Sequence, residues 1–208
     1  MHEHGRLGPI EWARAGRPLP SEYTSGDRGL AVDLDGEAAL FAVVDGLGHG
    51  PDAAAAALRA VETLNAARGK RLEVLIQLCH RVLEGTRGAA MTLARVDFAA
   101  STLSWIGVGN VTGELVAKAP TGINVRSSVR LTGGIVGYRI PEIRPAQVVS
   151  IRAGDLIVMA TDGIAEEYLE NIDFSASASV IAEQILSKYG KETDDAMVLT
   201  ARHRGATT

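Results

Sequence analysis

The sequence has only one cysteine, and it lacks both a long apolar run and an excess of positive charge. Cys79 has no partner for an internal disulfide and sits in an apolar stretch, so we expect a buried thiol in a reducing cytoplasm. No stretch approaches the roughly 18 apolar residues of a membrane span, and residues 1–5 offer no apolar signal core. A formal net charge of -4 disfavours broad nucleic-acid binding. We therefore expect a cytoplasmic protein whose partners include neither a membrane nor nucleic acid.

Internal repeats, low-complexity tracts and a phosphate-binding Gly-x-x-x-x-Gly-Lys-Ser/Thr loop are also missing from the sequence. Without such a loop, nucleotide hydrolysis by that route has no support. The chain does have enough apolar material for a packed core, since 46% of its 208 residues are hydrophobic. The length suits one domain, so we expect a single domain over residues 1–208 with a frayed end at residues 1–8.

Apolar runs between turn residues predict a mixed α and β chain. Helical spacing and flanking Pro or Gly residues predict helices over residues 51–67, 72–83 and 178–189. Strands are expected over residues 10–19, 29–34, 38–44, 89–96, 102–108, 114–117, 147–151, 155–160 and 196–201, with one or two more within residues 120–145.

Two short turns predict hairpins between neighbouring strands. Asp35-Gly36 separates the 29–34 and 38–44 runs, and Ala153-Gly154 separates the 147–151 and 155–160 runs. Short connections favour antiparallel pairing, and each sheet must bury its apolar face against another layer. The expected fold class is therefore α/β (α+β), a four-layer αββα sandwich of two mainly antiparallel sheets flanked by helices.

Acidic residues recur where the expected strands begin or end. Asp45 and Asp162 each follow an apolar run and precede a glycine. Asp27 and Asp194 lie just before expected strands. An acid that closes a buried strand is poorly placed for a solvated surface role, but it can meet others of its kind at a sheet edge. One Asp-Gly by itself is a common turn, so the indication comes from the whole set.

The chemistry of this set favours hard divalent cations. Carboxylates without histidine or cysteine partners suit Mg²⁺ or Mn²⁺. A glycine beside the acid leaves the backbone bare, so a carbonyl oxygen and bridging waters can reach an ion. The residues alone therefore predict an oxygen-lined metal site.

Four motifs carry a resemblance to a known family: Ser25-Gly26-Asp27, Val44-Asp45-Gly46-Leu47-Gly48-His49-Gly50, Ala160-Thr161-Asp162-Gly163-Ile164 and Asp194-Asp195-Ala196-Met197-Val198. In this order they resemble the metal-dependent protein phosphatases, in particular the SpoIIE-like bacterial branch related to protein phosphatase 2C. The resemblance runs from about residue 25 to residue 200. Gly107-Val108-Gly109-Asn110 and the chain length add a similarity to the phosphatases of the stressosome.

The resemblance implies roles for individual residues. Asp45 would bridge two Mn²⁺ or Mg²⁺ ions, and the carbonyl of Gly46 would bind one of them. Asp162 and Asp194 would complete the second site. Asp27 would hold metal-bound water, directly or through a neighbour. Asp195 and Gly163 would support these ligands, although Asp194 and Asp195 could exchange roles.

The resemblance also implies a reaction and a partner. A water activated by two ions would attack phosphoserine or phosphothreonine in line, without a phosphoenzyme. The implied substrates are phosphorylated STAS-domain scaffold proteins of the stressosome, in stress-response signalling.

The sequence departs from the animal members of the family at two places. Leu47 stands where those members carry a histidine, and His49 could replace it as general acid or could simply begin a helix. Their phosphate-binding arginine has no clear match, although Arg28 is adjacent to Asp27.

Three further residues are candidates for contact with substrate. Asn110 could hydrogen-bond to it or could belong to a tight turn after Ile106. Arg126 and Arg130, in the long segment 121–144, could dock an acidic partner or could be merely solvated.

Two other functions stay open at this point. Asp33-Leu34-Asp35-Gly36 resembles the first motif of haloacid-dehalogenase-type phosphatases, in which Asp33 would be the nucleophile. A catalytically silent protein that only binds a partner is the second alternative.

Overall fold

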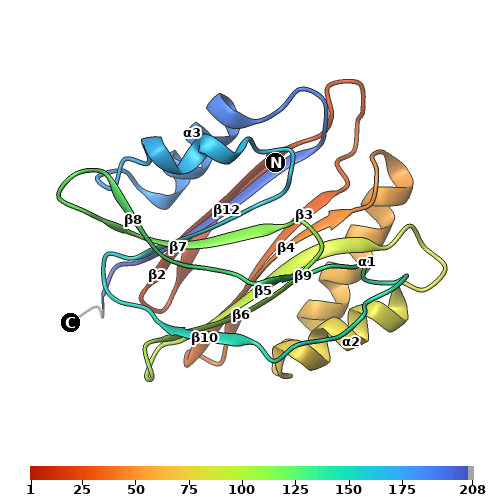
Figure 1. Cartoon of the computed structure of the whole chain (residues 1–208), viewed down its shortest axis with the longest axis horizontal. Helices are drawn as coiled ribbons and strands as arrows, with labels where there is room; N and C mark the ends of the chain where they lie inside the picture. Colours follow the sequence, from red (N-terminus) through yellow and green to blue (C-terminus); the bar gives the residue numbers. More distant parts are fainter. Residues whose placement is uncertain (206–208) are drawn as a thin grey trace.

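The computed structural model describes residues 1–205, which form two β-sheets between helices (Figure 1). The first sheet has the spatial order β1 (His2–Leu7), β2 (Ile10–Arg17), β12 (Ala196–His203), β11 (Leu156–Ala160), β7 (Thr112–Lys118) and β8 (Ile123–Ser128). The second has the order β10 (Gln147–Ser150), β6 (Thr102–Val108), β5 (Ala89–Asp97), β4 (Ala38–Gly46) and β3 (Asp27–Leu34), with the short β9 (Leu131–Thr132) beside β6. The helices are α1 (Pro51–Ala66), α2 (Leu72–Val82), α3 (Ala178–Tyr189) and the 3-10 helix η1 (Glu166–Asn171).

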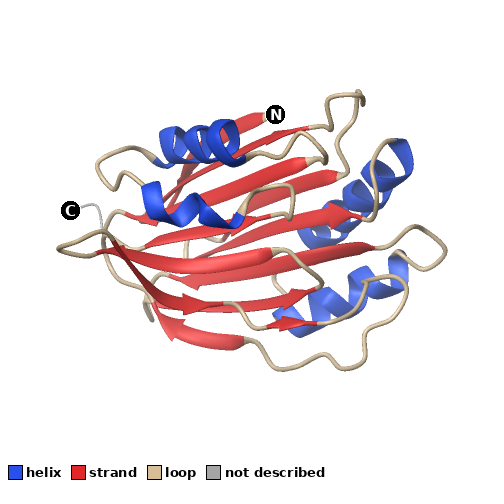
Figure 2. Ribbon diagram, turned by 45° about the horizontal axis from the view of Figure 1, so that its top comes forward, coloured by secondary structure: helices blue, strands red, loops and turns tan. Residues whose placement is uncertain are grey.

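The layers follow from strands that are apolar on both faces. On β4, Phe41 and Val43 face the core between the two sheets, whereas Leu40 and Val44 face the core beneath α1 and α2. A third core lies between the first sheet and α3 with η1. Figure 2 shows the helices on opposite sides of the strands. The expected αββα sandwich is confirmed, and within residues 1–205 the strand pairs are antiparallel except for β6 with β9.

Local sequence explains where the helices lie. α1 begins at Pro51, whose missing N–H costs nothing at the first helical position, and its buried face is mostly alanine, which allows close packing on the sheet. α3 begins after Ser177, whose hydroxyl accepts the Val180 N–H at 3.3 Å. Cys79 on α2 is fully buried, as expected. In the described part of the chain, the helices are too short or too polar to cross a membrane.

Two expectations about strands were wrong. The 147–151 and 155–160 runs do not form a hairpin, because β10 pairs with β6 in the second sheet while β11 lies between β7 and β12 in the first. The turn at Ala153-Gly154 therefore passes the chain from one sheet to the other. Residues 2–7 are not frayed, because their backbone pairs along its whole length with β2. The hairpin at Asp35-Gly36 is confirmed, with both residues at positive φ.

Candidate active site

The acidic residues meet where the ends of the two sheets come together. Asp27 at the start of β3 lies directly opposite Asp45 at the end of β4. Asp162 comes two residues after the end of β11, and Asp194 comes two residues before β12. The second sheet therefore contributes one pair of carboxylates and the first sheet contributes the other.

Hydrogen bonds join the two halves. The Thr161 hydroxyl of the first sheet donates to Asp27 Oδ2 at 2.8 Å. Asp195 Oδ2 accepts the Gly26 N–H at 2.7 Å, and its Oδ1 accepts the Leu19 N–H at the same distance. Both carboxylate oxygens of the buried Asp195 are thus occupied, so this residue ties the loop before β3 to the start of β12.

Asp194 is arranged differently from its neighbour. Its Oδ1 accepts the Asp195 N–H at 2.8 Å, and the side chain is only partly buried. It remains open toward the other carboxylates, whose charges act on it. This difference supports the assignment of Asp194, rather than Asp195, as the residue that could hold an ion.

The carboxylates repel one another in a buried setting. Burial and then the charge of Asp45 raise the pKa of Asp27 well above its usual value, although the hydrogen bond from Thr161 opposes this shift. Burial, followed by the charges of Asp162 and Asp194, raises the pKa of Asp45 to about 7. The charged neighbours that act on Asp45 are all carboxylates. Such a cluster is stabilised by cations, which bring the positive charge that the side chains lack.

The donor set fits hydrated Mg²⁺ or Mn²⁺ better than a closed protein cage. Among residues 1–205, no group of three or more His, Cys, Asp or Glu side chains is gathered closely enough to hold one metal ion by itself. Mg²⁺ is usually held by one or two carboxylates and keeps several waters, so it needs no such cage. Two carboxylates from each sheet match this coordination, in which water would supply the remaining ligands.

Two glycines are required by close packing around the site. A Cβ on Gly46 would lie 2.2 Å from the carbonyl oxygen of Ala53 in the first turn of α1. A Cβ on Gly163 would lie 1.8 Å from the carbonyl oxygen of Asp195. Each glycine allows the backbone next to an acidic residue to approach a neighbouring element.

Asn110 reaches the acidic cluster from the loop between β6 and β7. Its Nδ2 donates to Asp162 Oδ2 at 2.7 Å, while Gly109 before it adopts φ 92°. The tight turn and the position near the site, which the sequence left as alternatives, are both present. Asn110 orients the Asp162 carboxylate.

His49 lies at the rim of the cluster. Its side chain is exposed, and Nδ1 is 2.9 Å from Glu22 Oε1. The pKa of Asp194 is raised, mainly by burial, and the nearby His49 slightly opposes this rise. Arg28 is half-buried, and its Nη1 donates to the carbonyl oxygens of Ser25 and Asp27.

The two arginines proposed for docking differ in their surroundings. Arg126 is mostly buried and forms an ion pair with the buried Asp155, so its guanidinium is committed to the fold. Arg130 is exposed, and within residues 1–205 its backbone N–H donates to Gln147 Oε1 at 3.3 Å. Of the pair, Arg130 alone is available to a partner.

The interpretation of Asp33 as a dehalogenase-type nucleophile is wrong. Asp33 is exposed and accepts the Gly36 N–H at 2.8 Å within the β3–β4 turn. It lies six residues along β3 from Asp27, a separation of roughly 20 Å in an extended strand. The surrounding sheet is antiparallel, not the parallel sheet that this alternative requires.

The roles of two residues near the site could not be predicted from the sequence. Thr161 belongs to the motif around Asp162, but only the fold shows that its hydroxyl reaches Asp27. Lys191 precedes the final motif, and its Nζ donates to the carbonyl oxygen of Asp162 at 2.7 Å.

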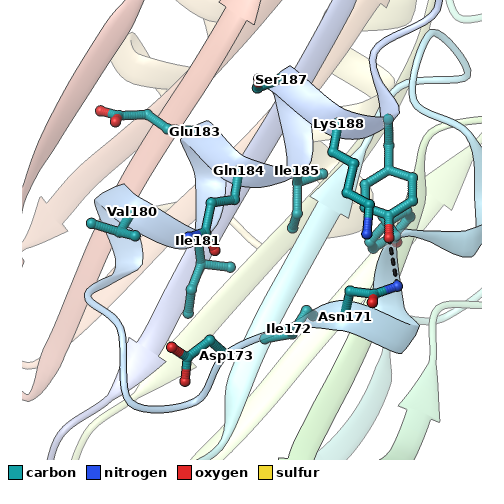
Figure 3. A pocket seen from close by; sticks show the side chains of 12 residues that line it. Asn171, Ile172, Asp173, Val180, Ile181, Glu183, Gln184, Ile185, Ser187 and Lys188 are labelled. Atoms are coloured by element: carbon teal, nitrogen blue, oxygen red, sulfur yellow. Dashed lines mark hydrogen bonds between the residues drawn. The ribbon is translucent and has the colours of Figure 1, made fainter.

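Cavities lie on both sides of η1. A cavity of about 380 Å³ borders the acidic cluster, and its lining includes Asn110, Thr161, Asp162 and Lys191. Another, of about 820 Å³, lies between η1 and α3 and is lined by none of the acidic motif residues (Figure 3). The smaller cavity is the one that belongs to the candidate site.

Comparison with protein families identifies the chain. The sequence pattern of the family described as Stage II sporulation protein E (SpoIIE) matches residues 35–204. The chain belongs to the SpoIIE family. This match confirms the resemblance to SpoIIE-type protein phosphatases of the 2C class, and it spans three of the four acidic motifs. The chain matches no curated protein sequence.

Solved structures share the fold of this SpoIIE-family chain. One comes from work on the bacterial stressosome as a modular system adapted to control secondary messenger signalling. It is 33% identical to this chain with a TM-score of 0.83, and the match covers 93% of this chain and 99% of that one. RsbX in complex with magnesium is 18% identical with TM-score 0.81, covering 97% and 99%. The phosphatase domain of SpoIIE from Bacillus subtilis, with a fragment of its regulatory domain, is 18% identical with TM-score 0.74, covering 100% and 66%. The two likenesses at 18% identity show the fold alone.

Proposed function

We propose that this SpoIIE-family protein is a metal-dependent phosphatase that hydrolyses phosphoserine or phosphothreonine on a partner protein. The observation that carries the proposal is the meeting of Asp27, Asp45, Asp162 and Asp194 from two sheets, with no cation among the charges that act on Asp45. Family membership supports the same activity.

The proposed metal ligands are oxygen atoms. Asp45, on which the charges of Asp162 and Asp194 act from the other sheet, would be shared by two ions, Mn²⁺ or Mg²⁺. The carbonyl of Gly46 and the carboxylates of Asp162 and Asp194 would complete the sites. When bound, such ions supply an acidified water and neutralise charge on the phosphoryl oxygens.

The chain's own side chains orient the reactants. Asp27, held by the Thr161 hydroxyl, accepts a hydrogen bond from the attacking water and directs it at the phosphorus atom. Asn110 fixes the rotation of the Asp162 carboxylate. We assign the proton donor to His49, because its imidazole lies at the rim of the cluster and is oriented there by Glu22, whose Oε1 is 2.9 Å from Nδ1. The proton would pass from this imidazole to the leaving seryl or threonyl oxygen.

The proposed substrates are phosphorylated STAS-domain scaffold proteins of the stressosome. The support is the 33% identity, over 93% of this chain, to a structure from work on the bacterial stressosome. RsbX supplies only a likeness of fold, although its structure contains magnesium.

Intact mass spectrometry tests the function directly. The purified protein is incubated with a phosphorylated STAS-domain protein in the presence of Mn²⁺ or Mg²⁺, and we expect loss of one phosphoryl mass from the substrate. Asp45→Asn and exhaustive chelation should each leave the substrate phosphorylated. Dephosphorylation that survives both would refute a metal-dependent reaction at this site. Binding of the phosphoprotein without any turnover would instead identify the catalytically silent alternative.

A further inference from the structure

Lys191 is held against the acidic cluster at three points. Its backbone N–H donates to the Gly163 carbonyl oxygen at 2.7 Å. Its own carbonyl oxygen accepts a hydrogen bond from Arg17 Nη2. Its Nζ donates to the Asp162 carbonyl oxygen at 2.7 Å. An exposed lysine usually moves freely, but here both the backbone and the ammonium are positioned.

The Lys191 ammonium borders the small cavity beside Asp162. Asn110, Thr112 and Asp162 line the same cavity of about 380 Å³. An ammonium has three N–H donors. Within residues 1–205, one of them is used, by the Asp162 carbonyl, so two remain for a ligand in the cavity.

The formal charges of the site favour a positively charged side chain beside the phosphate. The four carboxylates of the cluster and two divalent ions would cancel in formal charge. A phosphomonoester carries up to two negative charges, so a cation in addition to the two ions would strengthen its binding. Lys191 supplies a positive charge next to Asp162.

Other basic side chains near the cluster are engaged elsewhere. Arg28 is half-buried and directs Nη1 at the carbonyl oxygens of Ser25 and Asp27. Arg17 bonds the carbonyl oxygens of Pro18 and Lys191. Lys191 is therefore the best candidate for the role that the absent phosphate-binding arginine would have.

We propose that Lys191 binds the phosphoryl group of the substrate, and the inorganic phosphate product, through the two free N–H donors of its ammonium. This inference rests on the proposed function and names the residue that recognises the phosphate there. The ligand class is a phosphomonoester dianion or free phosphate bound beside Asp162.

The test compares Lys191→Ala and Lys191→Arg with Lys188→Ala. Lys188 is a matched control, because it carries the same charge three residues earlier but lines the larger cavity between η1 and α3 (Figure 3). Its Nζ lies 5.1 Å from the centre of the Tyr189 ring. For Lys191→Ala we expect KM for the phosphoprotein and the inhibition constant of inorganic phosphate to rise about tenfold, with kcat changed less than about threefold. Lys191→Arg should recover part of the affinity, and Lys188→Ala should match the wild type.

Metal binding separates phosphate recognition from a structural role. If Lys191 only held the Asp162 backbone, Lys191→Ala would weaken Mn²⁺ binding and leave the inhibition constant of phosphate unchanged, which would overturn the proposal. Calorimetric titration of inorganic phosphate into the Mn²⁺-loaded protein needs no turnover. It therefore tests Lys191 even if the wild type proves inactive, in which case only the proposed function fails. Equal phosphate affinity of the wild type and Lys191→Ala would also overturn the inference.

Discussion

Asp45 is buried among other carboxylates, and the resulting shift of its pKa has a sign that can be measured. Its pKa is raised from 3.8 to about 7 by burial and by neighbouring carboxylates. The folded metal-free protein therefore binds more protons than the unfolded chain between these values. The contribution of Asp45 to the free energy of unfolding thus falls as the pH rises from about 4 to about 7, and then levels off.

We predict that Asp45→Asn abolishes turnover and makes the metal-free protein more stable than the wild type above about pH 7. The gain should shrink toward about pH 5, where the wild-type carboxyl is itself protonated. Thermal unfolding in chelator across this range measures the effect. Asp33→Asn is the control, because it removes an exposed charge at the far end of β3 and should change neither turnover nor the pH slope. A wild type that is more stable than Asp45→Asn above about pH 7 would contradict the repulsion.

Thr161 illustrates a residue whose role depends on one hydroxyl. The hydroxyl donates to Asp27 Oδ2 at 2.8 Å and accepts the Met197 N–H at 3.0 Å, and the residue is buried. We predict that Thr161→Val lowers the free energy of unfolding by about 1–3 kcal/mol, because two buried polar groups lose a partner. It should also lower kcat, since Asp27 is no longer held. Urea unfolding and steady-state kinetics measure both, and Thr161→Ser, which keeps the hydroxyl, should stay close to the wild type. If the valine and serine variants have the same stability and kcat, the hydroxyl of Thr161 does not have this role.

At the scale of elements, the contact between the loop after β11 and the segment before β12 is the tightest near the site. A Cβ on Gly163 would lie 1.8 Å from the Asp195 carbonyl oxygen, so the segment that carries Asp194 would have to move. We predict that Gly163→Ala lowers the free energy of unfolding by about 1–3 kcal/mol and reduces turnover strongly.

Gly69→Ala provides the matched control for that change. A Cβ on Gly69 meets no atom within 4 Å, and both substitutions have the same effect on the unfolded chain. The difference between the two variants therefore isolates the close approach in the folded state. If both have the same stability and turnover, the segment before β12 adjusts without cost.

Elements whose partners are close in sequence could be predicted, whereas long-range pairings could not. The β3–β4 hairpin follows from Asp35-Gly36 between two apolar runs, and α1 follows from its proline and alanines. β10 was assigned the wrong partner because its alternation says nothing about which strand lies beside it. β1 was missed because its polar residues lack an apolar pattern, and its ladder with β2 is made by the backbone.

The same limit applies to the site. Asp45 and Asp162 could be found because each ends an apolar strand next to glycine. Lys191 could not be found, since its importance comes from a hydrogen bond to a residue 29 positions away. A single polar residue in a loop carries no periodic signal, and only the packing of the two sheets shows what it faces.

At the scale of the molecule, metal binding and folding should be coupled, because the carboxylates meet only when both sheets are packed. We predict that Mn²⁺ at about one hundred times its Kd stabilises the wild type by about 2.7 kcal/mol, which corresponds to a rise in Tm of roughly 5–10 °C. Thermal unfolding with and without Mn²⁺ measures this rise. Asp45→Asn should show no such rise, and NaCl of equal ionic strength should not reproduce it. A rise of the same size in Asp45→Asn would place the ion elsewhere.

The position of β12 in the first sheet affects when a chain that is being synthesised can complete the candidate site. β12 lies between β2, which is made long before it, and β11, which is made shortly before it. Residues 27–108 can assemble most of the second sheet as they leave the ribosome, whereas β2, already paired with β1, must wait for its other neighbour, β12. Asp194 emerges just before that last strand, so a nascent or truncated chain holds Asp27 and Asp45 without their counterpart. The order of translation thus keeps the proposed metal site incomplete until Asp194 and β12 have been made, and a chain cut short before them would lack the proposed activity.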